Sequence, residues 1–103
     1  MARILIGVVI GSCELILHLP DNHSLKGKRQ VSRSLVQRIR NRFNVAIAEV
    51  ADQDQWQVLS LGVSCVSDNA RHIDEILSKV IDFIDDQNSG AVLHQTRVEI
   101  IRV

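Results

Sequence analysis

Two stretches of this chain repeat their apolar residues at the spacing of an α-helix, and each is flanked by stretches in which apolar and polar residues alternate. Alternation is typical of β-strands, because successive side chains of a strand point to opposite faces of the sheet. Ser24 is a good N-cap for the first helix, which runs to about Phe43, and either Asp68 or Asn69 can cap the second, which runs to about Gln87. The predicted strands cover residues 4–19, 44–51, 56–67 and 91–103.

The order of these elements (strand, helix, strand, strand, helix, strand) predicts an α+β fold. Two strand–helix–strand units with right-handed crossovers form a four-stranded antiparallel sheet with both helices on one face, the ferredoxin-like βαββαβ arrangement. We expect the first and third strands to lie in the centre and to run parallel, so that both helices begin at the same end of the sheet. A chain of 103 residues has room for one domain. Residues 1–103 are therefore expected to form a single domain, with residues 1–7 as an N-terminal extension of its first strand.

The composition argues against a membrane protein and against a disulfide-stabilised one. No apolar run approaches the roughly 18 residues that a membrane span needs. The apolar start leads directly into a strand pattern and has no signal-peptide cleavage site. Cys13 and Cys65 both fall in apolar alternating stretches, where a buried free thiol is the common case. We therefore expect a cytoplasmic protein.

The residues do not predict a cofactor, a metal site or a catalytic centre. His18, Asp21 and His23 lack the tight paired spacing of zinc ligands, and no Gly-rich phosphate-binding loop is present. Three carboxylates are expected on an open sheet face that offers no cleft for catalysis: Glu14, Glu49 and Glu99. The sequence therefore predicts a protein that is not an enzyme, needs no cofactor and binds no metal.

The charged residues are unevenly distributed, although the formal net charge is zero. Residues 23–43 hold seven of the twelve Lys and Arg residues and no Asp or Glu. Several of these cations lie at the N-terminus of the first helix, where the partial positive charge of the helix dipole disfavours them and favours an anion. The second helix, expected to begin at the same end, adds two more basic residues. The predicted anion-binding rim consists of His23, Lys26, Lys28, Arg29, Arg33, Arg71 and His72.

The basic residues near the C-terminus of the first helix have a structural explanation. Arg38, Arg40 and Arg42 lie where the helix dipole favours cations. The second helix ends in three acidic residues, and the opposite charges can neutralise one another if the two C-termini lie close together. These acidic residues are Asp82, Asp85 and Asp86.

Four motifs resemble those of a known family: "HLPDNHSLKGKR", "RNRFNVAIAEV", "QDQWQ" and "GVSCVSDNARHID". They lie in register within residues 13–77, and on them the chain resembles the YlxP-like proteins, the domain of unknown function numbered 503. The resemblance implies a ferredoxin-like fold, a small bacterial cytoplasmic protein and no established enzyme activity. The family's genes often neighbour those for translation and ribosome maturation, which implies ribosomal RNA as a partner. Residues 1–7 precede the usual start of the family.

We therefore expect a non-enzymatic RNA-binding protein, associated with the ribosome, that uses the basic rim. The central strands carry no aromatic residue on which a base could stack, apart from Trp56 at the start of a strand, so contact should go through backbone phosphates. One alternative is a homodimeric interaction module that binds an acidic protein partner. Ile16, Ile47 and Ile101 would then form an apolar patch on the open sheet face. Another alternative is a sensor of a small anion.

Overall fold

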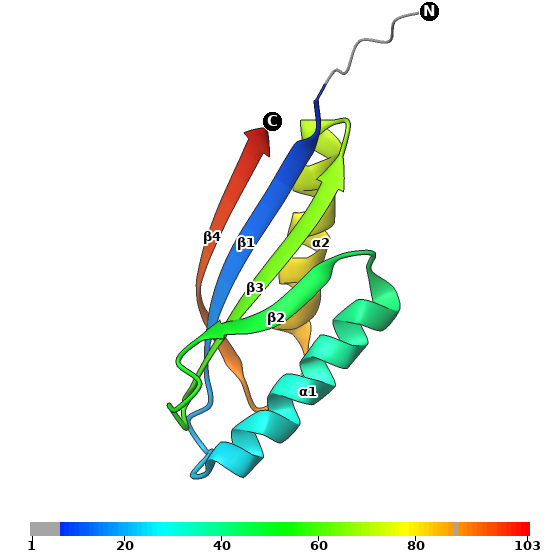
Figure 1. Ribbon diagram of the computed structural model, residues 1–103. Coiled ribbons are helices and arrows are strands. Elements are labelled where there is room, and N and C mark those ends of the chain that lie inside the picture. Colours follow the sequence, from blue (N-terminus) through cyan, green and yellow to red (C-terminus); the bar gives the residue numbers. More distant parts are fainter. Residues whose placement is uncertain (1–6, 88) are drawn as a thin grey trace, which may run out of the picture.

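The computed structural model describes residues 7–87 and 89–103, and within them the six predicted elements occur in the predicted order (Figure 1). The predicted extension of the first strand, apart from Gly7, lies outside the described residues. The strands and helices are β1 (Val9–His18), α1 (Leu25–Arg42), β2 (Ala46–Ala51), β3 (Val58–Ser67), α2 (Ala70–Asp86) and β4 (Val92–Arg102).

The four strands form one sheet in the order β2-β3-β1-β4, and every neighbouring pair is antiparallel. This confirms the α+β, ferredoxin-like fold. The expectation that β1 and β3 run parallel is wrong. Because α1 returns the chain so that β2 runs in the direction of β1, and a turn then reverses it into β3, β3 must oppose the β1 strand beside it. The two helices therefore begin at opposite ends of the sheet (Figure 1).

The core lies on one face of the sheet, as the alternation predicted. Cys13, Leu15 and Leu17 of β1 are fully buried, and their cross-strand partners on β3, for example Leu61 opposite Leu15, are buried with them. Both helices contribute to the same apolar cluster, so both cover the same face of the sheet. The buried helical residues of this cluster are Leu35 and Ile39 of α1, and Ile73, Leu77, Val80 and Ile84 of α2.

Both helices begin at capping residues that the sequence indicated. The Ser24 hydroxyl accepts a hydrogen bond from the backbone N–H of Gly27 at 2.9 Å. At the second helix the cap is Asn69 and not Asp68, since the Asn69 side-chain oxygen accepts from the N–H of Arg71 at 2.8 Å. Such caps satisfy N–H groups that have no partner inside the helix.

Both cysteines are free and lie in the core, which confirms the predicted buried thiols. Burial, and secondarily the carboxylate of Glu14, raises the pKa of the Cys13 thiol from 9.0 to about 11. Burial also raises the pKa of Cys65. Both shifts follow from the cost of placing a thiolate in an apolar environment. Among the described residues, no helix is long and apolar enough to cross a membrane.

The packing of α2 on β1 predicts a strong steric effect at Gly11. A Cβ atom there would lie 2.2 Å from Ile73 Cγ2 and 3.1 Å from Leu77 Cδ1. Gly11→Val should therefore lower the free energy of unfolding by about 1–3 kcal/mol through overpacking, measured by urea denaturation. Ser12→Val is the matched control, because Ser12 is the next residue and is exposed on the other face. An equal loss in both variants would contradict this packing.

The raised pKa of Cys13 predicts a thiol that is protected in the folded protein. At pH 8 native Cys13 should hold about a hundredfold less thiolate than an unfolded cysteine, since each pKa unit is a factor of ten. In a Cys65→Ser variant, a disulfide reagent should label Cys13 rapidly in urea and far more slowly without it. The same pKa shift means that the folded protein binds the Cys13 proton more tightly than the unfolded chain does. The protonated thiol therefore contributes to stability below pH 9, and this contribution is lost as the pH rises towards 11. Equal labelling rates would contradict the burial of Cys13.

Candidate nucleic-acid interface

The residues predicted to form one anion-binding rim lie in two groups at opposite ends of the sheet. α1 begins beyond the end of β1, whereas α2 begins beyond the end of β3, where Ser67 pairs with Val9 at the start of β1. Figure 1 shows that α1 and α2 begin at opposite ends of the sheet. Arg71 and His72, in the first turn of α2, are therefore separated from the basic residues in the first turns of α1. The prediction of a rim shared by the two helix N-termini is wrong, because it rested on parallel central strands.

Lys28 is a buried structural residue. It is 1% exposed, although it lies in the first turns of α1. Its ammonium group donates to the backbone carbonyl oxygens of Asp52 at 2.6 Å, and of Gln53 and Val58 at 3.2 Å each. Oε2 of Glu49 lies 3.8 Å from the same nitrogen. Since a lysine ammonium has three donors, Lys28 has none left for a ligand, and its predicted role in anion binding is wrong.

The contact made by Lys28 belongs to a larger junction between the β1–α1 loop and the β2–β3 turn. Nδ2 of Asn22 donates to the carbonyl oxygen of Trp56 at 2.6 Å, and Nε2 of Gln57 donates to that of Pro20 at 3.2 Å. Sequence reasoning missed both amides. The polar residues of "PDNHS" and "QDQWQ" could have indicated them, because an antiparallel β1–β3 pair brings these two connections to the same end of the sheet. We call four of these residues the loop–loop cluster: Asn22, Lys28, Asp52 and Gln57.

Three of the predicted cations remain exposed on α1. Lys26, Arg29 and Arg33 are exposed, and their spacing of three and four residues places them along one side of the helix. Within residues 7–87 and 89–103, none of them lies within 4.0 Å of a carboxylate oxygen. We call Lys26, Arg29 and Arg33 the α1 basic stripe. His23 is exposed just before the cap of the same helix.

The start of α2 has a different character. Arg71 Nε lies 3.6 Å from Oε1 of Glu75 one turn further along, and both side chains are largely exposed. The backbone N–H of His72 donates to the Asn69 cap at 3.4 Å. The N-terminus of α2 therefore has its own cap and counter-charge, and it adds nothing to the α1 basic stripe.

The C-terminal half of α1 lies beside the C-terminal half of α2, as the predicted neutralisation of opposite charges requires. The arginines of α1, however, contact groups other than the acidic side chains of α2. Arg38 donates to the side-chain oxygen of Gln87 at 3.0 Å, and the Arg42 guanidinium lies 5.0 Å from the centre of the Phe83 ring. Arg40 donates to the carbonyl oxygen of Ile47 at 3.0 Å. Among the described residues, the acidic residues at the end of α2 form no ion pair with these arginines.

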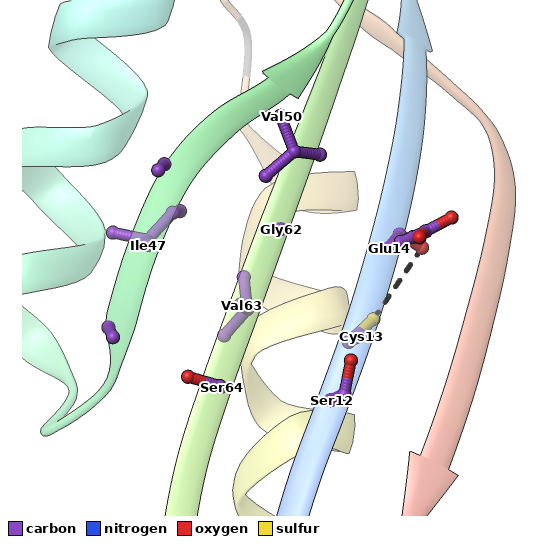
Figure 2. A pocket seen from close by; sticks show the side chains of 10 residues that line it. Ser12, Cys13, Glu14, Ile47, Val50, Gly62, Val63 and Ser64 are labelled. Carbon is purple, nitrogen blue, oxygen red and sulfur yellow. Dashed lines mark hydrogen bonds between the residues drawn. The ribbon is translucent and has the colours of Figure 1, made fainter.

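The open face of the sheet carries a shallow hollow of about 360 Å³. Figure 2 shows Val50 of β2 lying over Gly62 of β3, while Glu14 projects from β1 on the other side. The hollow has no aromatic side chain on which a base could stack. Its lining includes small residues at Ser12, Ala46, Ala48 and Ser64.

Two residues expected on the open sheet face lie elsewhere. Ile47 is buried in the core, and Glu49 approaches the ammonium group of Lys28. The prediction that Ile47 joins Ile16 and Ile101 in an apolar patch is therefore wrong, and the prediction that Glu49 lies on the open sheet face is wrong as well.

The part of the chain that the structure describes contains no group of three or more His, Cys, Asp or Glu residues that could hold a metal ion. The rings of His18 and His94 stack, with their centres 4.3 Å apart and their planes inclined by 15°. These two histidines therefore contact each other as aromatic rings.

Comparison with known proteins matches residues 10–97 to a family described as "Protein of unknown function (DUF503)". The uncharacterized protein YlxP of Bacillus subtilis (strain 168) is 41% identical over 73 residues, which cover 71% of this chain and 77% of that protein. Among solved structures, the de novo designed protein Foldit4 is similar with a TM-score of 0.53 at 12% identity, covering 91% of this chain and 96% of the designed one. This last likeness concerns the fold alone.

The different environments of Lys28 and Lys26 predict different effects of the same substitution. Lys28→Met should lower the free energy of unfolding by about 2–3 kcal/mol, because it removes charged hydrogen bonds to three backbone carbonyl groups. Lys26→Met, two residues away on the surface, should change it by no more than about 0.5 kcal/mol. Urea denaturation of both variants measures the difference. Equal effects would show that Lys28 does not stabilise the loop–loop cluster.

Proposed function

This chain belongs to the DUF503 family of proteins of unknown function, and we propose that it is a non-enzymatic RNA-binding protein whose α1 basic stripe holds backbone phosphates. The observation that carries the proposal is the exposure of Lys26, Arg29 and Arg33 without a carboxylate partner among the described residues. Ribosomal RNA is the first ligand to test, because it is the partner that the family resemblance implied.

The distribution of charge between α1 and the rest of the chain supports binding to a polyanion. α1 carries seven of the twelve basic residues and none of the twelve acidic ones, so the remaining chain holds five basic and all twelve acidic residues. The formal net charge of zero therefore conceals a strongly positive helix on an acidic body. Such a separation of charge attracts a polyanion to the α1 side of the molecule, whereas the acidic remainder of the molecule repels it.

The order of the stripe along the helix suits a phosphate backbone. Lys26 and Arg33 are seven residues apart, which is about 10 Å along a helix axis. Side chains along one edge of a helix can follow successive phosphates, and such contacts carry little base specificity. Two of the cations lie in the first turns, where the helix dipole opposes them. A bound phosphate would offset this unfavourable interaction between the cations and the helix dipole.

Two features of the described residues favour phosphate contacts over base readout. The hollow on the open sheet face has no aromatic lining. Phe43 and Phe83 pack against each other with ring centres 5.7 Å apart, so neither ring is free to stack on a base. Trp56, the third aromatic residue, is 54% exposed, but it lies in the turn between β2 and β3 and not on the sheet face.

The proposal predicts a salt-dependent affinity that depends on the stripe. Binding of a labelled ribosomal RNA fragment should be measured by fluorescence anisotropy across a series of KCl concentrations. Replacing Lys26, Arg29 and Arg33 together by Gln should weaken binding at low salt and reduce the slope of log K against log salt by about 2–3, because each lost phosphate contact removes roughly 0.7–0.9.

The matched control removes the same number of charges elsewhere, by Gln substitution of Arg71, Lys79 and Arg102, all of which are exposed. This variant should keep most of the slope and affinity. Equal losses in the two triple variants would mean that the stripe is not the binding surface. Absence of RNA binding by the unmodified protein at low salt, together with capture of an acidic protein that survives nuclease, would replace RNA by a protein partner.

A further inference from the structure

β4 forms an unusually exposed edge of the sheet. It is eleven residues long, and every residue from His94 to Arg102 is exposed. Val98 is 41%, Ile100 39% and Ile101 50% exposed. The other edge strand, β2, has six residues, an irregular register between Glu49 and Ala51, and α1 packed against it.

Proteins usually protect an edge strand against pairing with another chain by charged side chains, above all Lys, by Pro or by a bulge. From Thr96 to Arg102 the sequence is "TRVEIIR", which contains neither Pro nor Lys, and the charges of Arg97 and Glu99 have opposite signs, so that a second copy of the strand can neutralise them. The irregularity in the β1–β4 register precedes this segment. Among the described residues, this edge of β4 therefore retains backbone donors and acceptors that have no partner strand.

The hydrogen-bond pattern within residues 7–87 and 89–103 shows which backbone groups of β4 point away from β1. Val8 and Val103 exchange two backbone hydrogen bonds, of 3.2 and 2.8 Å, so they form a hydrogen-bonded pair. Hydrogen-bonded and non-hydrogen-bonded pairs alternate along an antiparallel ladder. Continuing this alternation along the β1–β4 register, four residues direct their N–H and C=O groups away from β1. These residues are Thr96, Val98, Ile100 and Arg102.

The charges on β4 select one register for pairing with a second copy. Arg97 and Glu99 lie on either side of Val98, on the same face of the strand, with Arg97 Nη2 and Glu99 Oε1 2.7 Å apart. With a twofold axis at Val98, each Arg97 lies directly opposite Glu99 of the partner subunit. With the axis at residue 97 or 99, like charges would lie opposite each other, Arg against Arg or Glu against Glu. Opposite charges stabilise such cross-strand pairs and like charges destabilise them.

We propose that a second copy of this chain pairs with β4, antiparallel, about a twofold axis at Val98. The two sheets then form one continuous sheet in which the β4 strands are the central pair. Val98 meets the partner's Val98 and Ile100 meets the partner's Thr96, so exposed apolar side chains on the helix-bearing face gain neighbours. A twofold contact of this kind uses the same surface on both copies and closes at two subunits. The proposal uses no residue of the α1 basic stripe, so it stands independently of RNA binding.

Charge reversal and sedimentation equilibrium test this register. The unmodified protein should dimerise, and Arg97→Glu or Glu99→Arg alone should weaken the dimer by about tenfold or more, because each replaces two attractive cross-strand pairs by two repulsive ones. An equimolar mixture of the two variants should form a heterodimer, since one strand then presents two acidic residues to two basic residues on the other. The double variant with both reversals should dimerise like the unmodified protein.

Two further variants distinguish pairing through β4 from association through another surface of the molecule. Val98→Pro removes a backbone N–H that does not bond to β1, so it should abolish the dimer, with urea denaturation showing whether the monomer remains folded. Arg71→Glu, an exposed charge reversal on α2, should leave the dimer unchanged. A monomeric unmodified protein at high concentration, dimers that survive either single reversal, or a mixture that stays monomeric would each overturn the proposal.

Discussion

The antiparallel pairing of β1 with β3 is the constraint on which the other features of this molecule depend. It brings the end of β1 beside the beginning of β3, where Leu19 N–H donates to the carbonyl oxygen of Gln57 at 2.9 Å and prolongs the ladder. The β1–α1 loop and the β2–β3 turn therefore meet at one end of the sheet, and α2 begins at the other (Figure 1). Both the loop–loop cluster and the separation of the two helix N-termini follow from this single pairing.

The loop–loop cluster divides the basic residues of α1 into two classes. Lys28 lies on the side of the helix that faces the β2–β3 turn, and its ammonium group is surrounded by carbonyl oxygens. Lys26 and Arg29, its neighbours in the sequence, point to solvent. A buried cation is tolerated only with such partners, and the described residues contain no buried side-chain nitrogen or oxygen without a hydrogen bond. From its composition, the basic start of α1 resembles a ligand-binding site, but one of its cations, Lys28, has a structural role.

The two surfaces proposed to bind partners belong to opposite edges of the sheet. α1 packs mainly against β2, whereas the free backbone edge belongs to β4, with β3 and β1 between them. A dimer through β4 would place its two α1 basic stripes at the outer edges of the combined sheet, leaving both accessible. Binding at one surface therefore does not require the other to be vacant, and variants of either surface can be interpreted separately.

The sequence alone determined the elements, their order, the N-cap at Ser24 and the buried alternation of Cys13, Leu15 and Leu17, because these depend on the local periodicity and capping of the chain. It also indicated that α1 holds an excess of positive charge. Only the tertiary structure decided which of those charged side chains are exposed. The carbonyl groups that accept hydrogen bonds from Lys28 belong to Asp52, Gln53 and Val58, which are 24, 25 and 30 positions further along the sequence. The antiparallel direction of β1 and β3 already followed from the predicted order of the elements and their right-handed crossovers. Edge exposure, in contrast, was decided by pairing between distant segments, which a one-dimensional pattern of apolar residues does not specify.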